Sequence, residues 1–296
     1  MNNNIYVLAK GQLGNQMFEY AMARSLSLST GGRPVMICNQ KGIELDCFTM
    51  FDDLQLADVP EHTFLTRIGY WLAGRIVLKY NLRKNFEQQK KHNWWLGFFG
   101  VFFCEMGFVK PFPFLMWRKT VHCNGYFQSE GYFKKHKDII LRDFTFKKSI
   151  KEKCSVLVDK IRNENSVCVH IRLGDYLDPK YAHFKVTDKT YFENAISYVK
   201  QHVNNPHFYV FTDSPAIFEK EYKTDDMELI PESYTSQESM YIGSNCKHHI
   251  MSNSSFSWWM QYLGQHVGQI VIAPKRWYTD NEQVSEGIYD SRWIKM

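Results

Sequence analysis

Residues 5–38 read IYVLAKGQLGNQMFEYAMARSLSLSTGGRPVMIC, and this stretch decides the fold class. Its first five residues form an apolar run that predicts a short buried strand, and Gly11 and Gly14 follow in a turn. Apolar side chains then recur at helical spacing as far as Gly31, before a second apolar run at residues 35–38. A strand, a glycine turn, a helix and a strand open a βαβ unit, so the sequence predicts an α/β fold.

The second half of the chain shows a similar alternation. Helical and strand-like segments follow one another at residues 149–163, 166–171, 190–203, 207–212, 216–222, 228–230, 248–251, 256–263 and 270–273. This pattern predicts a mainly parallel sheet, and a chain of 296 residues suits two domains of about 150 residues each. We therefore expect domains at residues 1–148 and 149–296, facing across a cleft, with ligands beyond the carboxyl ends of the strands.

The basic charge of the chain is concentrated in one region. The net charge is +5, and residues 62–120 hold ten Lys and Arg but only Glu87 and Glu105 as acids. Such a patch either faces an anionic lipid, nucleic acid or glycan, or is a solvated basic surface. No nucleic-acid-binding motif accompanies it, so we expect no nucleic-acid partner.

The most apolar run, residues 94–109, lies inside this region. Its 16 residues are shorter than the roughly 20 that a membrane-spanning helix needs. It either lies on a membrane surface, as a peripheral contact, or is buried in the first domain, and burial is favoured. The first four residues do not resemble a secretory signal, so the sequence predicts a cytoplasmic protein.

The segment at residues 170–176, HIRLGDY, follows a predicted strand. The guanidinium of Arg172 can bind phosphate oxygens in pairs, and Gly174 permits a tight turn with exposed N–H groups. His170 lies beside the arginine, and Asp175 can pin it or the loop. A salt bridge between Arg172 and Asp175 explains the bare motif equally well.

Three further strand ends carry polar groups. Residues 252–259, SNSSFSWW, form a serine-rich turn into a helix, which suits an anion site or a helix cap. Asn15 either reaches a phosphate or sugar oxygen or caps the first helix. Asp213 either accepts from a guanine or ribose or caps a helix before Pro215.

Metal-binding patterns are missing from the sequence. It has no Asp-x-Asp pair, its seven cysteines form no C-x-x-C pair, and the adjacent His248 and His249 point to opposite faces of a strand. We therefore expect no metal ion or other cofactor. A metal-free site must neutralise a leaving diphosphate with Arg, helix dipoles and hydroxyl groups.

Taken in order, these motifs resemble glycosyltransferase family 11, the α-1,2-fucosyltransferases. The resemblance rests on the motifs at residues 11–18, 125–129, 170–176, 211–213 and 252–259, and it spans nearly the whole chain. It implies a GT-B fold, with an acceptor-side first domain and a donor-binding second domain. It also implies GDP-β-L-fucose as the donor and a galactose-terminated surface glycan as the acceptor, with inversion to an α-linkage and no metal.

The resemblance also implies roles for single residues. It assigns Arg172, with His170 beside it, to the donor diphosphate and places the serine-rich turn near the β-phosphate through Ser254, Ser255 and Phe256. Gly14 and Asn15 would reach the donor from the first domain, and Asp213 would bind the nucleoside. Many members have a second arginine where this chain has Leu173, so any contribution of that arginine to donor affinity is missing here.

Overall fold

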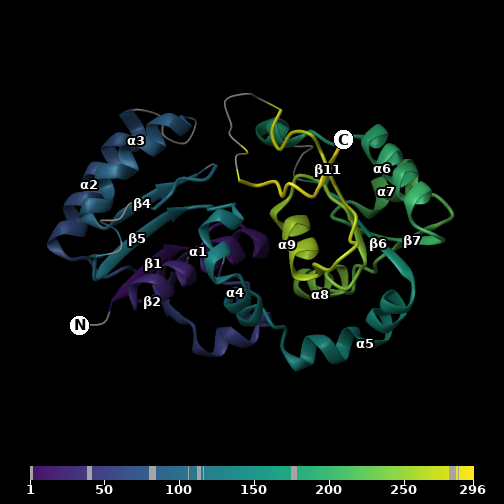
Figure 1. The fold of residues 1–296 in the computed structure, drawn as a ribbon, viewed down its shortest axis with the longest axis horizontal. Coiled ribbons are helices and arrows are strands. Elements are labelled where there is room, and N and C mark those ends of the chain that lie inside the picture. Colours follow the sequence, from purple (N-terminus) through teal and green to yellow (C-terminus); the bar gives the residue numbers. More distant parts are fainter. Residues whose placement is uncertain are drawn as a thin grey trace. The chain divides into compact units, whose positions relative to one another are not determined.

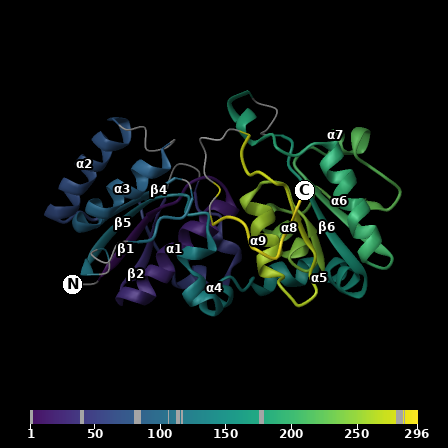
Figure 2. The same ribbon diagram turned by 45° about the horizontal axis from the view of Figure 1, so that its top comes forward.

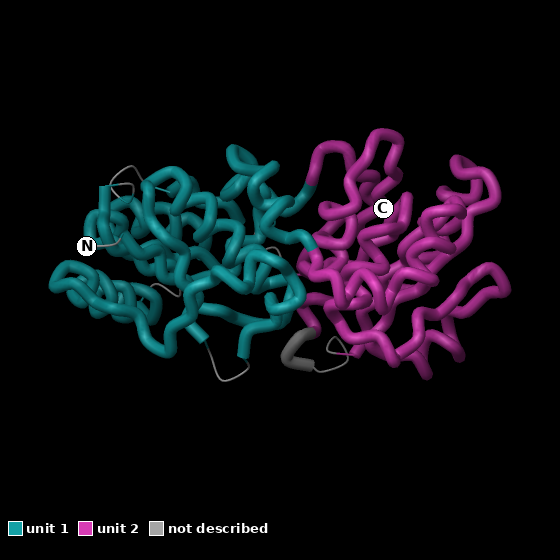
Figure 3. Tube along the Cα trace, turned by 90° about the horizontal axis from the view of Figure 1, so that it is seen from below, with its two compact units in different colours: residues 1–145, 281–289 teal, residues 146–280, 290–296 magenta. Residues whose placement is uncertain are grey.

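A computed structural model describes residues 3–38, 42–79, 85–105, 107–111, 115, 117–174, 179–279, 285 and 287–296. The chain divides into two compact units (Figure 3). Unit 1 comprises residues 1–145 with 281–289, and unit 2 comprises residues 146–280 with 290–296. Residues 281–289 belong to unit 1, whereas the predicted boundary after residue 148 assigned them to the second domain.

The sheet of unit 1 is parallel and, in the described residues, has the order β3-β2-β1-β5-β4 (Figure 1). Its strands are β1 Asn4–Leu8, β2 Arg33–Ile37, β3 Gln55–Ala57, β4 Val101–Cys104 and β5 Thr120–Gly125. Its helices are α1 Leu13–Thr30, α2 Phe64–Lys79, α3 Phe86–Leu96 and α4 Lys137–Asp143, with 3-10 turns η1 Leu45–Cys47, η2 Thr49–Asp53, η3 Gly97–Phe99, η5 Glu130–Tyr132 and η6 Lys134–His136. The α/β class with parallel sheets, predicted from residues 5–38, is confirmed.

Unit 2 has a parallel sheet with the order β11-β10-β9-β6-β7-β8 among the described strands. These are β6 Asn165–Ile171, β7 Pro206–Thr212, β8 Met227–Leu229, β9 His248–Ile250, β10 Val271–Ala273 and β11 Ile294–Lys295. The helices are α5 Lys148–Asn163, α6 Lys189–His202, α7 Pro215–Glu221, α8 Ser236–Gly243 and α9 Ser255–Leu263, and η8 Pro179–Phe184 is a 3-10 turn. All three strands of the centre, β9, β6 and β7, run in the same direction.

The strand order fixes where a ligand can bind in unit 2. From β6 the chain adds β7 and β8 on one side, and then returns to add β9, β10 and β11 on the other. The order therefore reverses between β6 and β9, and the crevice at the carboxyl ends of two such strands is the usual ligand site of an open parallel sheet. In unit 1 the same reversal lies between β1 and β5.

The central strand β6 is buried on both faces, as a parallel strand between two helix layers should be. Val167, Val169 and Ile171 belong to the apolar cluster that packs under α6 and α7. Cys168 and His170 lie on the opposite face, where the Sγ of Cys168 contacts the Sδ of Met260 in α9 and His170 bonds to Ser257. β6 is thereby held in place by helices on both sides.

The apolar run at residues 94–109 does not form a single element. It spans the end of α3, the turn η3 and the buried strand β4, while Trp94 and Phe98 remain exposed. The preference for burial is thus confirmed for its strand and wrong for these two aromatic side chains. Among the described residues, no helix combines the length and the hydropathy that a membrane span needs.

Gly125 gives a test of the β4–β5 pairing. Its φ of 154° and its register opposite Cys104 leave no room for a side chain, because a Cβ would overlap the Cys104 carbonyl oxygen. We expect Gly125→Ala to lower the free energy of unfolding by more than about 3 kcal/mol, measured by urea denaturation. Gly31→Ala is the control: its φ is 71° with open space around it, and it should cost only about 1–2 kcal/mol. Equal losses in the two variants would contradict the steric explanation.

Candidate functional site

Arg172 follows the last residue of β6 and is held by Asp213, which follows the last residue of β7. The Nε of Arg172 donates to Oδ2 of Asp213 at 2.9 Å. The second carboxylate oxygen, Oδ1, accepts from the backbone N–H groups of Leu173 at 2.9 Å and Gly174 at 3.0 Å. One carboxylate therefore fixes both the arginine side chain and the loop that carries it.

Gly174 makes this close approach easier. A Cβ at this position would come within 3.0 Å of Oδ2 of Asp213. A larger residue would push the loop away from the carboxylate and weaken its two backbone hydrogen bonds. The glycine thus permits a compact loop, as the sequence analysis proposed, but its partner is Asp213.

The charges of this pair are well defined. Partial burial alone would raise the pKa of the Asp213 carboxyl, but the hydrogen bonds from Gly174 and Leu173 and the charge of Arg172 outweigh it and lower the pKa. Asp213 therefore stays ionised at neutral pH. Asp175, the predicted salt-bridge partner of Arg172, lies outside the described part of the chain.

His170 is buried behind the arginine and joins three elements. Its Nδ1 lies 2.9 Å from the Oγ of Ser252, which follows β9, and 2.6 Å from the Oγ of Ser257 in α9. Burial, followed by the charge of Arg172, lowers the pKa of His170 to about 3. The imidazole is therefore neutral at physiological pH and acts as a hydrogen-bond junction, without a charge of its own.

The serine-rich turn forms the start of α9. Ser254 is the N-cap, and its hydroxyl accepts from the backbone N–H of Phe256 at 3.2 Å. Ser255 begins the helix, and the ring of Phe256 lies 5.5 Å from that of His170. Asn253 anchors the turn by donating to the carbonyl oxygens of Phe184 and Trp277. The helix-cap reading is therefore correct for Ser254, and the other polar residues hold the turn beside His170.

These positions bring most of the predicted site together at one edge of unit 2. Arg172, Asp213 and the turn before α9 follow the neighbouring strands β6, β7 and β9 at their carboxyl ends. A guanidinium and a helix N-terminus there provide positive charge and directed N–H groups, which together suit an anionic ligand. Asp175 lies outside the described residues.

Gly14 and Asn15 belong to unit 1, where they are the second and third residues of α1. The N-cap is Gln12, so the alternative role of Asn15 as a helix cap is wrong. The Oδ1 of Asn15 accepts from Nε2 of Gln128 at 2.8 Å, which joins the start of α1 to the loop after β5. The N–H of Leu13 donates to the carboxylate of Glu44, so an anion of the protein already occupies part of this helix start.

Three carboxylates, Glu19, Asp46 and Asp175, are candidates for a catalytic base. Glu19 is fully buried in α1, and burial raises the pKa of its carboxyl well above the usual value. Its Oε2 accepts from the backbone N–H of Lys10. A fully buried carboxyl is poorly placed to receive a proton from a substrate hydroxyl, whereas Asp46 is exposed in η1.

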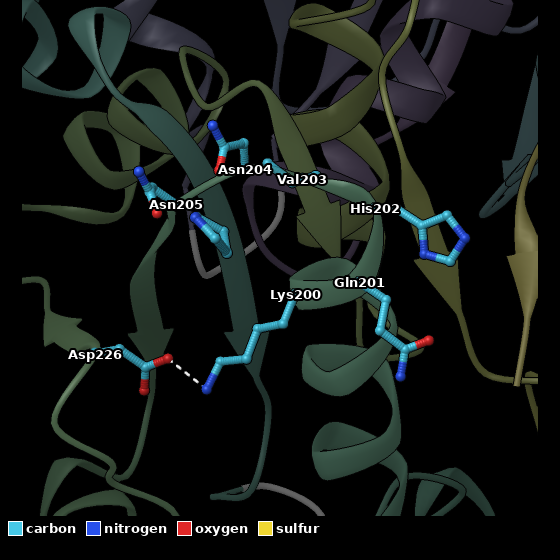
Figure 4. Close-up of a pocket in the computed structure, with 8 residues that line it drawn as sticks. Lys200, Gln201, His202, Val203, Asn204, Asn205 and Asp226 are labelled. Atoms are coloured by element: carbon cyan, nitrogen blue, oxygen red, sulfur yellow. Dashed lines mark ion pairs between the residues drawn. The ribbon is translucent and has the colours of Figure 1, made fainter.

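A cavity of unit 2 lies at the opposite edge of its sheet. Figure 4 shows its lining, which runs from Lys200 to Pro206 with Asp226. Pro206 begins β7, so the cavity is at the amino ends of the strands, and Lys200 pairs with Asp226 at 2.6 Å. It is therefore no part of the site around Arg172. The described residues contain no group of three His, Cys, Asp or Glu side chains arranged to hold a metal ion.

The comparison with protein families decides the assignment. The sequence model of glycosyl transferase family 11 matches residues 109–296, which include Arg172, Asp213 and the serine-rich turn. The chain belongs to this family. The resemblance seen in the sequence motifs is thereby confirmed.

Two relatives from Escherichia coli show the range within the family. An alpha-1,2-colitosyltransferase is 37% identical over 186 residues, which cover 60% of this chain and 63% of that relative. The O-antigen biosynthesis glycosyltransferase WbnK is 26% identical over 99% of this chain and all of its own length. Among solved structures, the fucosyltransferase NodZ from Bradyrhizobium is similar in fold, with a TM-score of 0.55, 14% identity and coverage of 88% and 92% of the two chains.

Some residues of this site escaped the sequence analysis. Ser252 and Ser257 were part of a quoted motif, yet nothing in their spacing showed that both bond to His170. Asn253 was equally visible, but its partners come from residues 69 and 24 positions away. Asp213 was selected, but its pairing with Arg172 depends on two strands becoming neighbours.

Asp213 can be tested through stability. We expect Asp213→Ala to lower the free energy of unfolding by about 1–3 kcal/mol, because it leaves two backbone N–H groups and a guanidinium without their acceptor. Chemical denaturation measures this loss. Asp225→Ala, at an exposed neighbouring position, is the control and should change stability by less than about 0.5 kcal/mol. An unchanged stability in Asp213→Ala would show that the carboxylate does not hold the loop.

His170 should make the fold sensitive to acid. The pKa of His170 is about 3 in the folded protein and 6.5 when the side chain is exposed to water, as in the unfolded chain. Between pH 3 and pH 6.5 the unfolded chain therefore binds more protons at this position than the folded protein does. Its contribution to stability is therefore lost as the pH falls from 6.5 toward 3. We expect His170→Gln to show a shallower loss of stability between pH 7 and pH 4 than the parent, by denaturation at each pH. His202→Gln, exposed at the end of α6, should keep the parent slope, and identical slopes for all three proteins would contradict a buried neutral His170.

Proposed function

We propose that this protein transfers L-fucose from GDP-β-L-fucose to a hydroxyl of a galactose-terminated surface glycan, with inversion and formation of an α-1,2 linkage. The observation that carries the proposal is the orientation of Arg172 by Asp213 beside the start of α9. Family membership supports a sugar transferase, and a structural neighbour co-crystallised with GDP, NodZ, supports a nucleotide-sugar donor.

In this proposal the donor diphosphate binds to Arg172 and to the turn before α9. The ion pair with Asp213 uses Nε, and the terminal nitrogens of a guanidinium form the fork that binds phosphate oxygens. Ser254, Ser255 and the helix start add hydroxyl and N–H donors near the β-phosphate, with Phe256 beside them. In this arrangement Arg172, two hydroxyl groups and a helix start would together neutralise the diphosphate as it leaves.

The chemistry follows from this charge distribution. As the bond from fucose to GDP lengthens, negative charge grows on the diphosphate and positive charge on the sugar ring. Arg172 stabilises the departing GDP, an electrostatic contribution that is usually large in enzymes. Because Arg172, hydroxyl groups and a helix start can neutralise the diphosphate, we propose a reaction without a metal ion.

His170 and Asp213 act in this scheme as positioning residues. The neutral imidazole ties β6 to Ser252 and Ser257, and the Asp213 carboxylate orients the arginine. Contact of Asp213 with the nucleoside remains a prediction, and we favour the positioning role because both of its oxygens already have partners. A catalytic role for Asp175, and donor contacts of Gly14 and Asn15 across a cleft of the GT-B type, also remain predictions.

A second donor is favoured by one comparison. The relative that is 37% identical is named a colitosyltransferase, and colitose is the 3-deoxy form of L-fucose. GDP-colitose would bring the same diphosphate to Arg172 and differ only at the sugar. Transfer assays with GDP-fucose, GDP-colitose, GDP-mannose and UDP-sugars against a panel of galactosides, with the linkage read by NMR, separate these possibilities. Binding of a donor or an acceptor without any acceptor-dependent release of GDP would instead indicate a nucleotide- or glycan-binding module.

Arg172→Ala is the direct test of the proposed function. We expect kcat/KM for GDP-fucose to fall at least about a hundredfold, because the main counter-charge of the leaving diphosphate is removed. Arg172→Lys should recover little, since an ammonium cannot pair with Asp213 and a phosphate through a planar fork. Arg162→Ala, an exposed arginine of α5 that bonds to Asn245, should retain parent activity. Substantial turnover in Arg172→Ala, with the fold verified by circular dichroism, would refute the assignment.

A further inference from the structure

The helix α2 of unit 1 has three large apolar side chains, Phe64, Trp71 and Leu78, on its exposed side. Its buried residues are small: Thr66, Gly69 and Ala73. Gly69 lies so close to the sheet that a Cβ there would come within 2.7 Å of Phe99 Cβ and 2.8 Å of Val101 Cγ2. The small face therefore packs closely against the protein, with Tyr70 and Leu72 partly buried beside it, and α2 has apolar residues on its exposed side as well.

The outer face of α2 carries a line of exposed apolar residues. Phe64 is 79% exposed, Trp71 is 56% exposed and Leu78 is 84% exposed. They are seven residues apart, and a spacing of seven returns to within about 20° of the same direction on an α-helix. We call these three residues the apolar stripe.

Positive charges flank the apolar stripe. Arg67 and Arg75 are exposed on the same helix, and the guanidinium of Arg75 lies 4.0 Å from the ring of Trp71. α2 has no acidic residue along its length. The adjacent helix α3 and turn η3 add the exposed aromatic residues Trp94 and Phe98, and α2 and α3 lie side by side in both ribbon views (Figures 1 and 2).

We propose that this face of α2 docks on the surface of an anionic lipid bilayer. Tryptophan and phenylalanine insert at the boundary between headgroups and acyl chains, while arginine side chains extend to lipid phosphates. A helix of 16 residues with three cations lies in the plane of the bilayer and does not cross it. The glycan acceptors of surface polysaccharide synthesis, which belong to the proposed function, offer a reason for such docking, but the charge and exposed side chains of α2, α3 and η3 support it without them.

A second copy of this chain fits the same face less well. A symmetric contact would place Arg67 and Arg75 of one copy against the same face of the other, where α2 offers no carboxylate. An anionic membrane supplies both the apolar phase and the opposite charge. The two arrangements predict different outcomes in one experiment.

The experiment is co-sedimentation of the whole protein with two kinds of vesicle, phosphatidylcholine alone and phosphatidylcholine mixed with phosphatidylglycerol. We expect binding to the mixed vesicles that weakens as salt is added. Arg67→Glu with Arg75→Glu should lower the partition coefficient by about tenfold or more. The matched control, Lys148→Glu with Lys189→Glu, reverses two exposed lysines of unit 2, which are 87% and 58% exposed, and should bind almost like the parent.

The apolar part of the proposal is tested separately. Phe64→Ser, Trp71→Ser and Leu78→Ser in one chain should abolish sedimentation with mixed vesicles while leaving turnover of a soluble acceptor unchanged. Val156→Ser with Val267→Ser, at positions 85% and 102% exposed in unit 2, is the matched control and should bind like the parent. Equal binding of parent and triple variant, or equal binding to both kinds of vesicle, would overturn the proposal. A loss of self-association in the triple variant, without vesicle binding by the parent, would identify a contact between copies instead.

Discussion

The carboxylate of Asp213 is the contact on which the candidate site depends. Its two oxygens accept from the Arg172 side chain and from two consecutive backbone N–H groups of the following loop. A guanidinium at the end of a strand has many rotamers in water, and fixing it costs conformational entropy. The contact with Asp213 orients the arginine when the protein folds, so a ligand would bind a side chain that is already in place. Preorganised charge of this kind is what makes electrostatic stabilisation effective.

The register of the sheet makes this contact possible. β6 and β7 pair in parallel from Asn165 opposite Pro206 to Ile171 opposite Thr212. The residues that follow the two strands, Arg172 and Asp213, are consequently neighbours. A slip by one position would send one of these side chains to the opposite face. The long, buried pairing of β6 with β7 therefore secures the geometry of the site.

The sequence was sufficient for the class of the fold and for the site's approximate location. Glycine turns and alternating apolar runs located β1, α1, β6 and β7, because these elements combine clear periodicity with clear ends. The helix α8 was missed even though Thr235 and Glu238 form a capping box, a signal readable from spacing alone. β4 was missed for a different reason: it lies within a longer apolar run, and periodicity cannot divide such a run between helix, turn and strand. The partners of Asp213 and His170 depend on strand order, which no local pattern contains.

Leu173 stands where the resemblance predicts a second arginine, and the alternation of side chains between the two faces of β6 explains where it points. Along β6, Val167, Val169 and Ile171 face the apolar cluster under α6 and α7, while His170 faces α9. Continued past the strand, this alternation places Leu173 with the apolar cluster, and its side chain does pack there. Its backbone N–H, however, still donates to Asp213. The contact that holds the loop comes from the main chain, so it does not require an arginine at this position. An arginine at this position, as the resemblance leads us to expect in many members, would add a charge to the region but is not needed to support Arg172.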